Sequence, residues 1–412
     1  METQIELVIF AILGCVVVYS LLSNLINRSV LTLPIIFVFV GYIVSDPVKM
    51  LGSHDELRNY ARYLAEITLI LVLFSDASNV RLAKLKQSYK IPLRMLVLGL
   101  PLTIFIGTLT VWAIAPAGGF AMALLTAAVL SPTDAAIGQS VVTNPNVPDR
   151  LSQSINVESG LNDGLALPFV LLGAALAAAS MAESATDGLA TSAIMQIVLG
   201  PVVGIAVGWL AARGLGLAQD RQWVLESAQG VVFIASAFAC YLGAELIGGN
   251  GFVAAFVGGA TFGNVYRHSL HFVTEFMEGN GQMLTMAAFL IFGATMLPDA
   301  FAHVSMMPIV IAVLFLTIVR MVPIWISLAG TGLAPREKLF LGWFGPRGLA
   351  SILFTLIIMA DFDFPNEEEF LACISMTVFI SIILHGVTAT PFANRIGRKS
   401  AKDQQDNKSA AE

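Results

Sequence analysis

Several side chains able to bind a cation stand close together inside one long apolar stretch. They are Asn156, Glu158, Ser159, Asn162 and Asp163. Residues three or four apart share a helix face, so Ser159 is expected beside Asp163, with Asn156 further along the same stripe. This stripe offers carboxylate, hydroxyl and amide oxygens, which can replace the lost water of a hard monovalent cation. The spacing therefore predicts a cation site centred on Asp163.

The two carboxylates of this stretch have different expected roles. Burial in a bilayer penalises the charged form of a carboxylate, so Asp163 is expected to hold either a proton or a cation, but hardly both. That competition is sufficient to couple the fluxes of the two ions. Glu158 has an expected partner in Arg320, the only charge in the middle of the stretch 306–329. We expect a structural ion pair, because leaving either buried partner alone costs about 3–5 kcal/mol.

Two other apolar stretches are interrupted in their middle. The stretch 119–142 contains Ser131-Pro132-Thr133-Asp134, and the stretch 337–360 contains Gly345-Pro346-Arg347-Gly348. Proline removes a backbone donor, and irregular backbone at membrane depth survives only inside protein or beside water. Either break alone would be interpreted as a kink in a packing helix. As a pair in corresponding places they predict two crossing unwound helices beside a transport site.

The composition indicates how these residues are positioned. Of 412 residues, 57% are hydrophobic and 12% are charged, which excludes an ordinary soluble domain and indicates many membrane spans. A membrane helix needs ~20 mostly apolar residues. We expect thirteen spans, at approximately 4–22, 31–45, 63–79, 92–115, 119–142, 152–179, 190–212, 224–246, 249–263, 282–297, 306–329, 337–360 and 369–393. The short second, ninth and tenth spans leave a count of twelve open.

The distribution of basic residues predicts the orientation. With the C-terminal tail in the cytoplasm and the N-terminus outside, inner segments hold 17 of the 22 basic residues and outer segments hold only Lys49, Arg58 and Arg62. We expect a multi-pass protein of the plasma (inner) membrane of a prokaryote, in contact with lipid. Residues 394–412 are polar and are predicted to be a disordered cytoplasmic tail. A net charge of −6 without a basic run predicts no nucleic-acid partner.

Taken together, these motifs resemble those of a known family. The segment Glu158-Ser159-x-x-Asn162-Asp163 resembles the signature of the sodium/proton exchanger branch of the monovalent cation:proton antiporters. Thr133-Asp134 resembles the Thr-Asp of that family's unwound helix. Gly345-Pro346-Arg347-Gly348 resembles its Gly-Leu-Arg-Gly segment, and Arg320 stands where the family has a buried arginine.

The resemblance implies the fold and the mechanism. The fold would be an all-α antiporter fold with inverted repeats, forming one transporter domain over 1–393. Within it, a core bundle would span approximately 92–179 and 306–393, and the remaining helices would form an interface and scaffold. The protein would be a homodimer that exchanges Na⁺, or else Li⁺ or K⁺, for H⁺ by an elevator-like movement. It would be a transporter without a cofactor, not an enzyme.

The resemblance also implies a role for each site residue. Asp163 would bind the metal ion with help from Ser159 and Thr133, and Asp134 would help to hold the crossing. Glu158 would pair with Arg320. The remaining expected residues of the site and the unwound segments are Asn162, Pro132, Gly345, Pro346 and Arg347. Asn162 in place of a second aspartate is typical of electroneutral members, and one titrating carboxylate per monovalent cation gives the same 1:1 exchange.

Some features depart from the family pattern. Ala135 follows Thr133-Asp134 where many members have proline, and Pro346 replaces the usual leucine. Asp76 belongs to a segment that only loosely resembles the family's, so it is either an extra cation ligand or a helix-end charge. His385 is alone in the last span and is more typical of a satisfied core group than of a proton relay. The alternative functions are a cation channel and a proton-coupled solute symporter.

Overall fold

The chain is all helical over the part that the structure describes. The computed structural model describes residues 2–26, 31–49, 54–80, 90–142, 144–180, 189–269, 271–302 and 305–409. Within these residues each of the thirteen predicted spans coincides with one helix or with a helix in two or three parts. The prediction of an all-α polytopic fold is confirmed.

Eight spans are single helices and five are divided. The single helices are α1 (Glu2–Ile26), α2 (Leu33–Ile43), α4 (His54–Asn79), α10 (Asp149–Ala179), α11 (Leu189–Asp220), α12 (Glu226–Glu245), α13 (Gly251–Val265) and α20 (Glu367–Ser409). The divided spans are α6 (Lys90–Arg94) with a π-helical turn and α7 (Leu100–Ile114), α8 (Gly119–Val129) with α9 (Ala135–Val142), α14 (His271–Ile291) with a second π turn and α15 (Leu297–Ala302), α16 (Met306–Leu316) with α17 (Ile318–Ser327), and α18 (Pro335–Trp343) with α19 (Leu349–Asp361). A short helix, α3 (Ser45–Lys49), follows α2.

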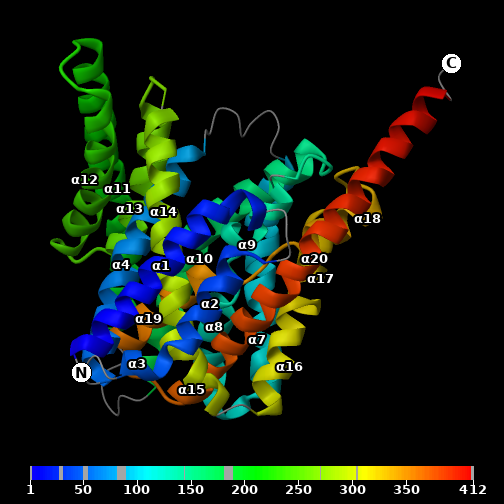
Figure 1. Cartoon of the computed structure of the whole chain (residues 1–412), viewed down its shortest axis with the longest axis horizontal. Coiled ribbons are helices and arrows are strands. Elements are labelled where there is room, and N and C mark those ends of the chain that lie inside the picture. The colour runs from blue at the N-terminus through cyan, green and yellow to red at the C-terminus, as the bar shows by residue number, and fades with distance from the viewer. Residues whose placement is uncertain are drawn as a thin grey trace.

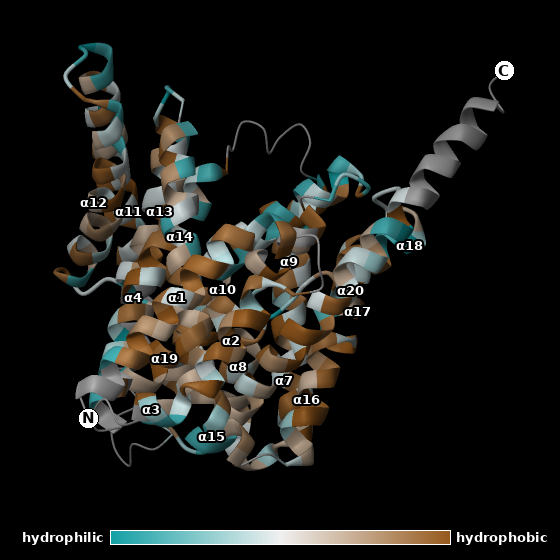
Figure 2. Cartoon of the chain, in the orientation of Figure 1, coloured by the Kyte–Doolittle hydropathy of each residue, from teal (hydrophilic) through white to brown (hydrophobic). Residues whose placement is uncertain are grey.

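The surface of this bundle is typical of a membrane protein. Eight of the described helices are long and apolar enough to cross a bilayer, and four shorter helices are also apolar. Large side chains such as Phe10, Leu21 and Val202 are more than half exposed, which is costly in water but not in lipid. Figure 2 shows apolar residues around the middle of the bundle and hydrophilic residues toward its upper and lower ends. The chain is therefore a multi-pass membrane protein.

The two ends of the chain leave the bundle on opposite sides. In Figure 1, α1 begins at the lower side and α20 ends at the upper side, as an odd number of spans requires. Which side faces the cytoplasm stays a prediction. Among the basic residues that predicted it, Arg28, Arg81, Lys84 and Lys86 lie outside the described residues.

The helices pack in two groups that meet along α4. In one group, α11, α12 and α13 pack on one another and α13 packs on α4. The contact between α13 and α4 requires glycine: a Cβ atom on Gly259 or Gly263 would overlap the backbone carbonyl of Phe74 or Ser78. In the other group α8 packs on α7 and α10, and α16 packs on α20, while α19 touches α4. The division into a core bundle and a scaffold stays a prediction.

The C-terminal segment differs from its prediction. Helix α20 continues to Ser409, so residues 394–409 are helical rather than disordered. The composition predicts disorder because these residues bury little apolar surface. A helix already nucleated in the membrane, however, can extend at little further cost, since only nucleation is strongly unfavourable.

Candidate cation site

The two broken helices cross, and Asp134 connects them. Its backbone N–H donates to the carbonyl oxygen of Pro346 at 2.7 Å. Its side-chain Oδ1 accepts from the N–H of Ala136 at 2.6 Å and of Ile137 at 3.3 Å, and its Oδ2 accepts from the N–H of Leu349 at 2.5 Å. Helix N-termini carry unpaired N–H groups and a partial positive charge. One carboxylate therefore caps both α9 and α19.

Arg347 stabilises the C-terminal end of a helix, whereas Asp134 caps helix N-termini. Its buried guanidinium donates to the carbonyl oxygens of Ser131 and Pro132, the latter at 2.9 Å, just beyond the C-terminus of α8. A cation is favoured there, because the last carbonyl groups of a helix carry a partial negative charge. Ser351 adds a hydrogen bond to the carbonyl oxygen of Val129 at 2.7 Å. Asp134 of the first break and Arg347 of the second therefore provide hydrogen-bond partners for the backbone groups that the two interruptions leave unpaired.

Two glycines make this crossing sterically possible. A Cβ atom on Gly345 would overlap the guanidinium of Arg320, and one on Gly348 would overlap the carboxylate of Asp134. Gly348 has extended backbone, so the requirement is for space and not for an unusual conformation. The Gly-Pro-Arg-Gly segment therefore combines a missing donor at Pro346, a helix-end cation and two positions without side chains.

Helix α20 satisfies the backbone of the second break. The N–H of Arg347 donates to Ser381 Oγ at 2.7 Å, and Ser381 Oγ lies 3.2 Å from His385 Nδ1. His385 Nε2 lies 3.0 Å from the carbonyl oxygen of Trp343, the last residue of α18. His385 Nδ1 also lies 3.0 Å from the carbonyl oxygen of Ser381, so both ring nitrogens contact backbone carbonyl groups and the ring links α20 to the end of α18. Sequence reasoning gave Ser381 no role, although its spacing of four residues from His385 places both on one helix face.

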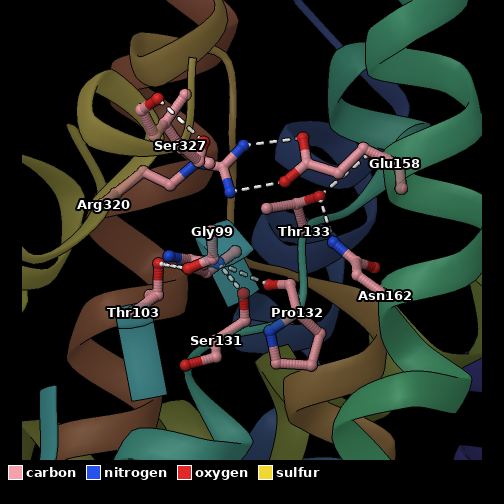
Figure 3. A network of polar contacts seen from close by, with 12 residues as sticks. Gly99, Thr103, Ser131, Pro132, Thr133, Glu158, Asn162, Arg320 and Ser327 are labelled. Atoms are coloured by element: carbon pink, nitrogen blue, oxygen red, sulfur yellow. Dashed lines mark hydrogen bonds and ion pairs between the residues drawn. The ribbon is translucent and has the colours of Figure 1, made fainter. Parts of the chain in front are cut away.

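Three polar side chains meet between α10 and the first break. Asn162 Nδ2 donates to Thr133 Oγ1 at 2.5 Å (Figure 3). Thr133 Oγ1 also lies 3.1 Å from Ser159 Oγ. All three residues are buried. Among the described residues, no hydrogen-bond partner is found for Asn162 Oδ1 or for Asp163 Oδ1. Buried oxygens without a partner are rare, which marks this position as one that suits a cation or a proton.

Asp163 borders a cavity of about 430 Å³ between α10, α4 and α14. Ser159, Asp76 and Asp134 also border it. The described lining contains three carboxylates and no lysine or arginine, so the cavity attracts cations. It extends to Asn79, the last residue of α4, and so reaches toward the side on which α20 ends.

The structure therefore separates the expected site residues into two layers. Asp163, Ser159, Asp134 and Asp76 border the cavity, whereas Thr133 and Asn162 lie behind Ser159. The position of Asp76 against the small residue Gly160 places it opposite α10 rather than at an exposed helix end.

Glu158 and Arg320 form a separate unit. The distance is 2.5 Å between Arg320 Nη1 and Glu158 Oε1, and 2.7 Å between Arg320 Nη2 and Glu158 Oε2 (Figure 3). Both residues are 2% exposed, and the two parallel contacts give the fixed geometry typical of bidentate pairs. This ion pair joins α10 to α17, and neither residue borders the cavity beside Asp163.

Known proteins share both this fold and this sequence pattern. The sodium proton antiporter MjNhaP1 from Methanocaldococcus jannaschii, in a structure at pH 8, aligns with a TM-score of 0.77 and 17% identity over 96% of this chain and 99% of that one. The K(+)/H(+) antiporter NhaP2 of Shewanella sp. (strain ANA-3) is 22% identical over 90% of this chain, and the K(+)/H(+) antiporter NhaP of Alkalimonas amylolytica is 23% identical over 94%.

The family is established by a match over almost the whole chain. This chain spans 64% of the length of the Shewanella relative and 67% of that of the Alkalimonas relative. The family described as "Sodium/hydrogen exchanger, transmembrane" matches residues 6–395. The chain therefore belongs to the sodium/hydrogen exchanger family.

Proposed function

We propose that this chain is a secondary active antiporter that exchanges a monovalent cation for a proton at Asp163. The observation that carries the proposal is the buried Oδ1 of Asp163, which has no partner among the described residues and borders a cavity lined by carboxylates. A cation there would gain ligands from Asp163 and Ser159. Thr133 and Asn162 would orient the Ser159 hydroxyl through the hydrogen bonds described above.

The proton and the cation compete for one carboxylate. Protonated Asp163 carries no charge to hold a cation, whereas ionised Asp163 attracts one. Each exposure of the site to one side of the membrane therefore loads either ion, and the empty charged state is disfavoured by burial. Asp134 is held by three backbone N–H groups, so we assign it a structural role. Asp76 would add a second acidic ligand on α4.

Charge counting supports a 1:1 exchange. If Asp163 alone changes its protonation during the cycle, one monovalent cation replaces one proton and no net charge moves. We propose Na⁺ or K⁺ as the cation, with Li⁺ as a further substrate, because the named relatives include both sodium and potassium antiporters. We further propose a homodimer in the plasma membrane, with the N-terminus outside and the C-terminus in the cytoplasm.

A second cavity supports alternating access. It has a volume of about 330 Å³ and is lined by residues of both helix groups, such as Tyr241 of α12 and Phe354 of α19, and by Arg62 and Asp361. Arg62 Nη2 lies 2.6 Å from Asp361 Oδ1, so an ion pair joins α4 to the end of α19. We propose that the cavity beside Asp163 is the cytoplasmic route and that this second cavity belongs to the closed outer route.

The test is a flux measurement in proteoliposomes that hold a proton gradient and an internal pH dye. Addition of Na⁺, Li⁺ or K⁺ should dissipate the gradient with the wild-type protein and should generate essentially no current. Asp163→Asn should abolish the response. Asp149→Asn, an exposed aspartate at the start of the same helix, is the matched control and should retain it. Normal exchange by Asp163→Asn would disprove the site, and a cation current that follows voltage would indicate a channel.

A further inference from the structure

A groove between α18 and α20 combines arginines with an apolar floor. The cavity has a volume of about 360 Å³ and is lined by Arg336, Arg395, Phe340, Trp343 and Phe392, together with further apolar residues. Helices α17 and α18, and α18 and α20, pack together at the end of the molecule where α20 leaves it (Figure 1). We propose that this groove binds one anionic phospholipid, with its phosphate between the two arginines and an acyl chain on the apolar floor.

The groove lies on the outer surface of α17, α18 and α20 and not between the two helix groups that meet along α4. Leu339 is 48% exposed and Phe392 is 37% exposed, and both line it. Because these helices cross the membrane, apolar side chains exposed there face lipid. An acyl chain is therefore the neighbour that this floor meets first.

The charges around the groove favour an anionic headgroup. Arg336 and Arg395 are the two charged residues of the described lining, so the groove carries a net positive charge. Lys338 lies outside this lining, over the ring of Trp325 on α17 at 5.6 Å. The nearest acid in the sequence, Glu337, is buried and directed away, because it binds Arg150 and the N–H of Ala334. Tryptophan rings are enriched at the membrane interface, and basic pockets between membrane helices on the cytoplasmic side bind anionic headgroups.

A lipid in this groove would touch a residue that borders the second break. Trp343 is the last residue of α18, and its indole Nε1–H donates to Thr388 Oγ1 at 3.1 Å. Its carbonyl oxygen is the one that lies 3.0 Å from His385 Nε2. The bound lipid would therefore stabilise the contact between α18 and α20. This contact lies directly beside the unwound segment that follows Trp343.

The test measures lipid binding to the purified full-length protein. Phosphatidylglycerol and phosphatidylcholine would be titrated in detergent and followed by native mass spectrometry, with thermal unfolding as a second measurement. The wild-type protein should bind phosphatidylglycerol more tightly and unfold at a higher temperature with it. The Arg336→Gln/Arg395→Gln variant should weaken binding roughly 30-fold, as expected for two lost contacts between cations and the headgroup.

The matched control removes two arginines at the same end of the molecule. Arg213 and Arg221 are exposed and also lie near tryptophan rings, but outside the groove. Arg213→Gln/Arg221→Gln should bind phosphatidylglycerol as the wild type does. Equal losses in both double variants, or equal affinity of the wild type for phosphatidylcholine, would overturn the proposal. Competition by inorganic phosphate alone would overturn it too, since the acyl chain would then be irrelevant.

Photolabelling of the wild-type protein tests the proposal independently of the double variant, and so also applies if that variant does not fold. A photoactivatable phosphatidylglycerol should label peptides that contain residues 336–343 and 392–396. Labelling confined to other segments would contradict the assignment. So would a crosslink between these two segments of different copies, because it would show that protein covers the groove.

Discussion

Two carboxylates on helix α10, only five residues apart, illustrate how burial and partnership differ. Glu158 has both oxygens within 2.7 Å of Arg320 and lies outside the cavity, whereas Asp163 Oδ1 has no partner among the described residues and borders it. Burial alone therefore does not define an exchange site. A fixed countercharge makes one carboxylate part of the framework, and its absence leaves the other available to a mobile ion.

The strongest test of this contrast breaks the ion pair. Glu158→Gln or Arg320→Gln alone should lower the free energy of unfolding by about 3–5 kcal/mol, because a buried charge is left without its partner. The double variant should regain most of that loss. Thermal unfolding of purified protein measures the effect, and a double variant as unstable as the sum of the singles would refute pairing as the cause.

The same change from carboxylate to amide at Asp163 should have the opposite profile. Asp163→Asn should reduce exchange by at least about 100-fold, since it removes the proton-binding group and the charge that attracts the cation. Its unfolding temperature should be equal to that of the wild type or higher, because Asp163 Oδ1 has no hydrogen-bond partner among the described residues that the substitution could remove. Ion flux and thermal unfolding measured on one preparation distinguish an ion-binding role of Asp163 from a structural one. A large fall in the unfolding temperature of Asp163→Asn would indicate a structural role.

The pH dependence sharpens the comparison further. If protons and cations compete at Asp163, the cation concentration for half-maximal exchange should rise by up to about tenfold for each unit of pH lowered, in the range where protonated Asp163 predominates. The maximal rate should change less. Initial rates over a grid of pH and cation concentration measure this. A fall in maximal rate at constant half-saturation would speak against competition.

The smallest expected effect concerns the neutral ligands. Ser159→Ala should raise the half-saturating cation concentration by about fivefold, the value of roughly one hydrogen bond, with little change in maximal rate. Ser152→Ala is a control on the same helix, since its hydroxyl donates to the carbonyl oxygen of Val142 outside the site. An unchanged half-saturation in Ser159→Ala would exclude its hydroxyl from the ligands.

Much of the fold follows from patterns within single segments. Each of the thirteen apolar stretches coincides with a helix or a divided helix, because its own apolar residues define it. Pro132 and Pro346 locate the breaks because proline acts on its own helix. The adjacency of Ser159 and Asp163 follows in the same way. The contact of Glu158 with Arg320 is predictable from the sequence, because a lone buried charge needs a partner of opposite charge and the apolar stretches contain few.

Contacts between distant segments account for what the sequence did not indicate. The bonds from Asp134 to Leu349, and the space that Gly345 leaves for Arg320, depend on how two helices cross. Asp76 borders the cavity because of the face that α4 turns toward α10. The segment around Asp76 only loosely resembles the family motif, so the sequence does not determine which face that is. Ser381 accepts from the backbone N–H of Arg347, which lacks a helical partner only because the helix is interrupted between α18 and α19. No pattern within the sequence around Ser381 indicates this contact.

The shared cap at the crossing limits how the protein can move. Asp134 covers amide groups of α9 with one oxygen and of α19 with the other. Pulling the two half-helices apart would break the hydrogen bonds from those amide groups to Asp134. In the alternating access that we propose, α9 and α19 are therefore expected to move together as one rigid unit.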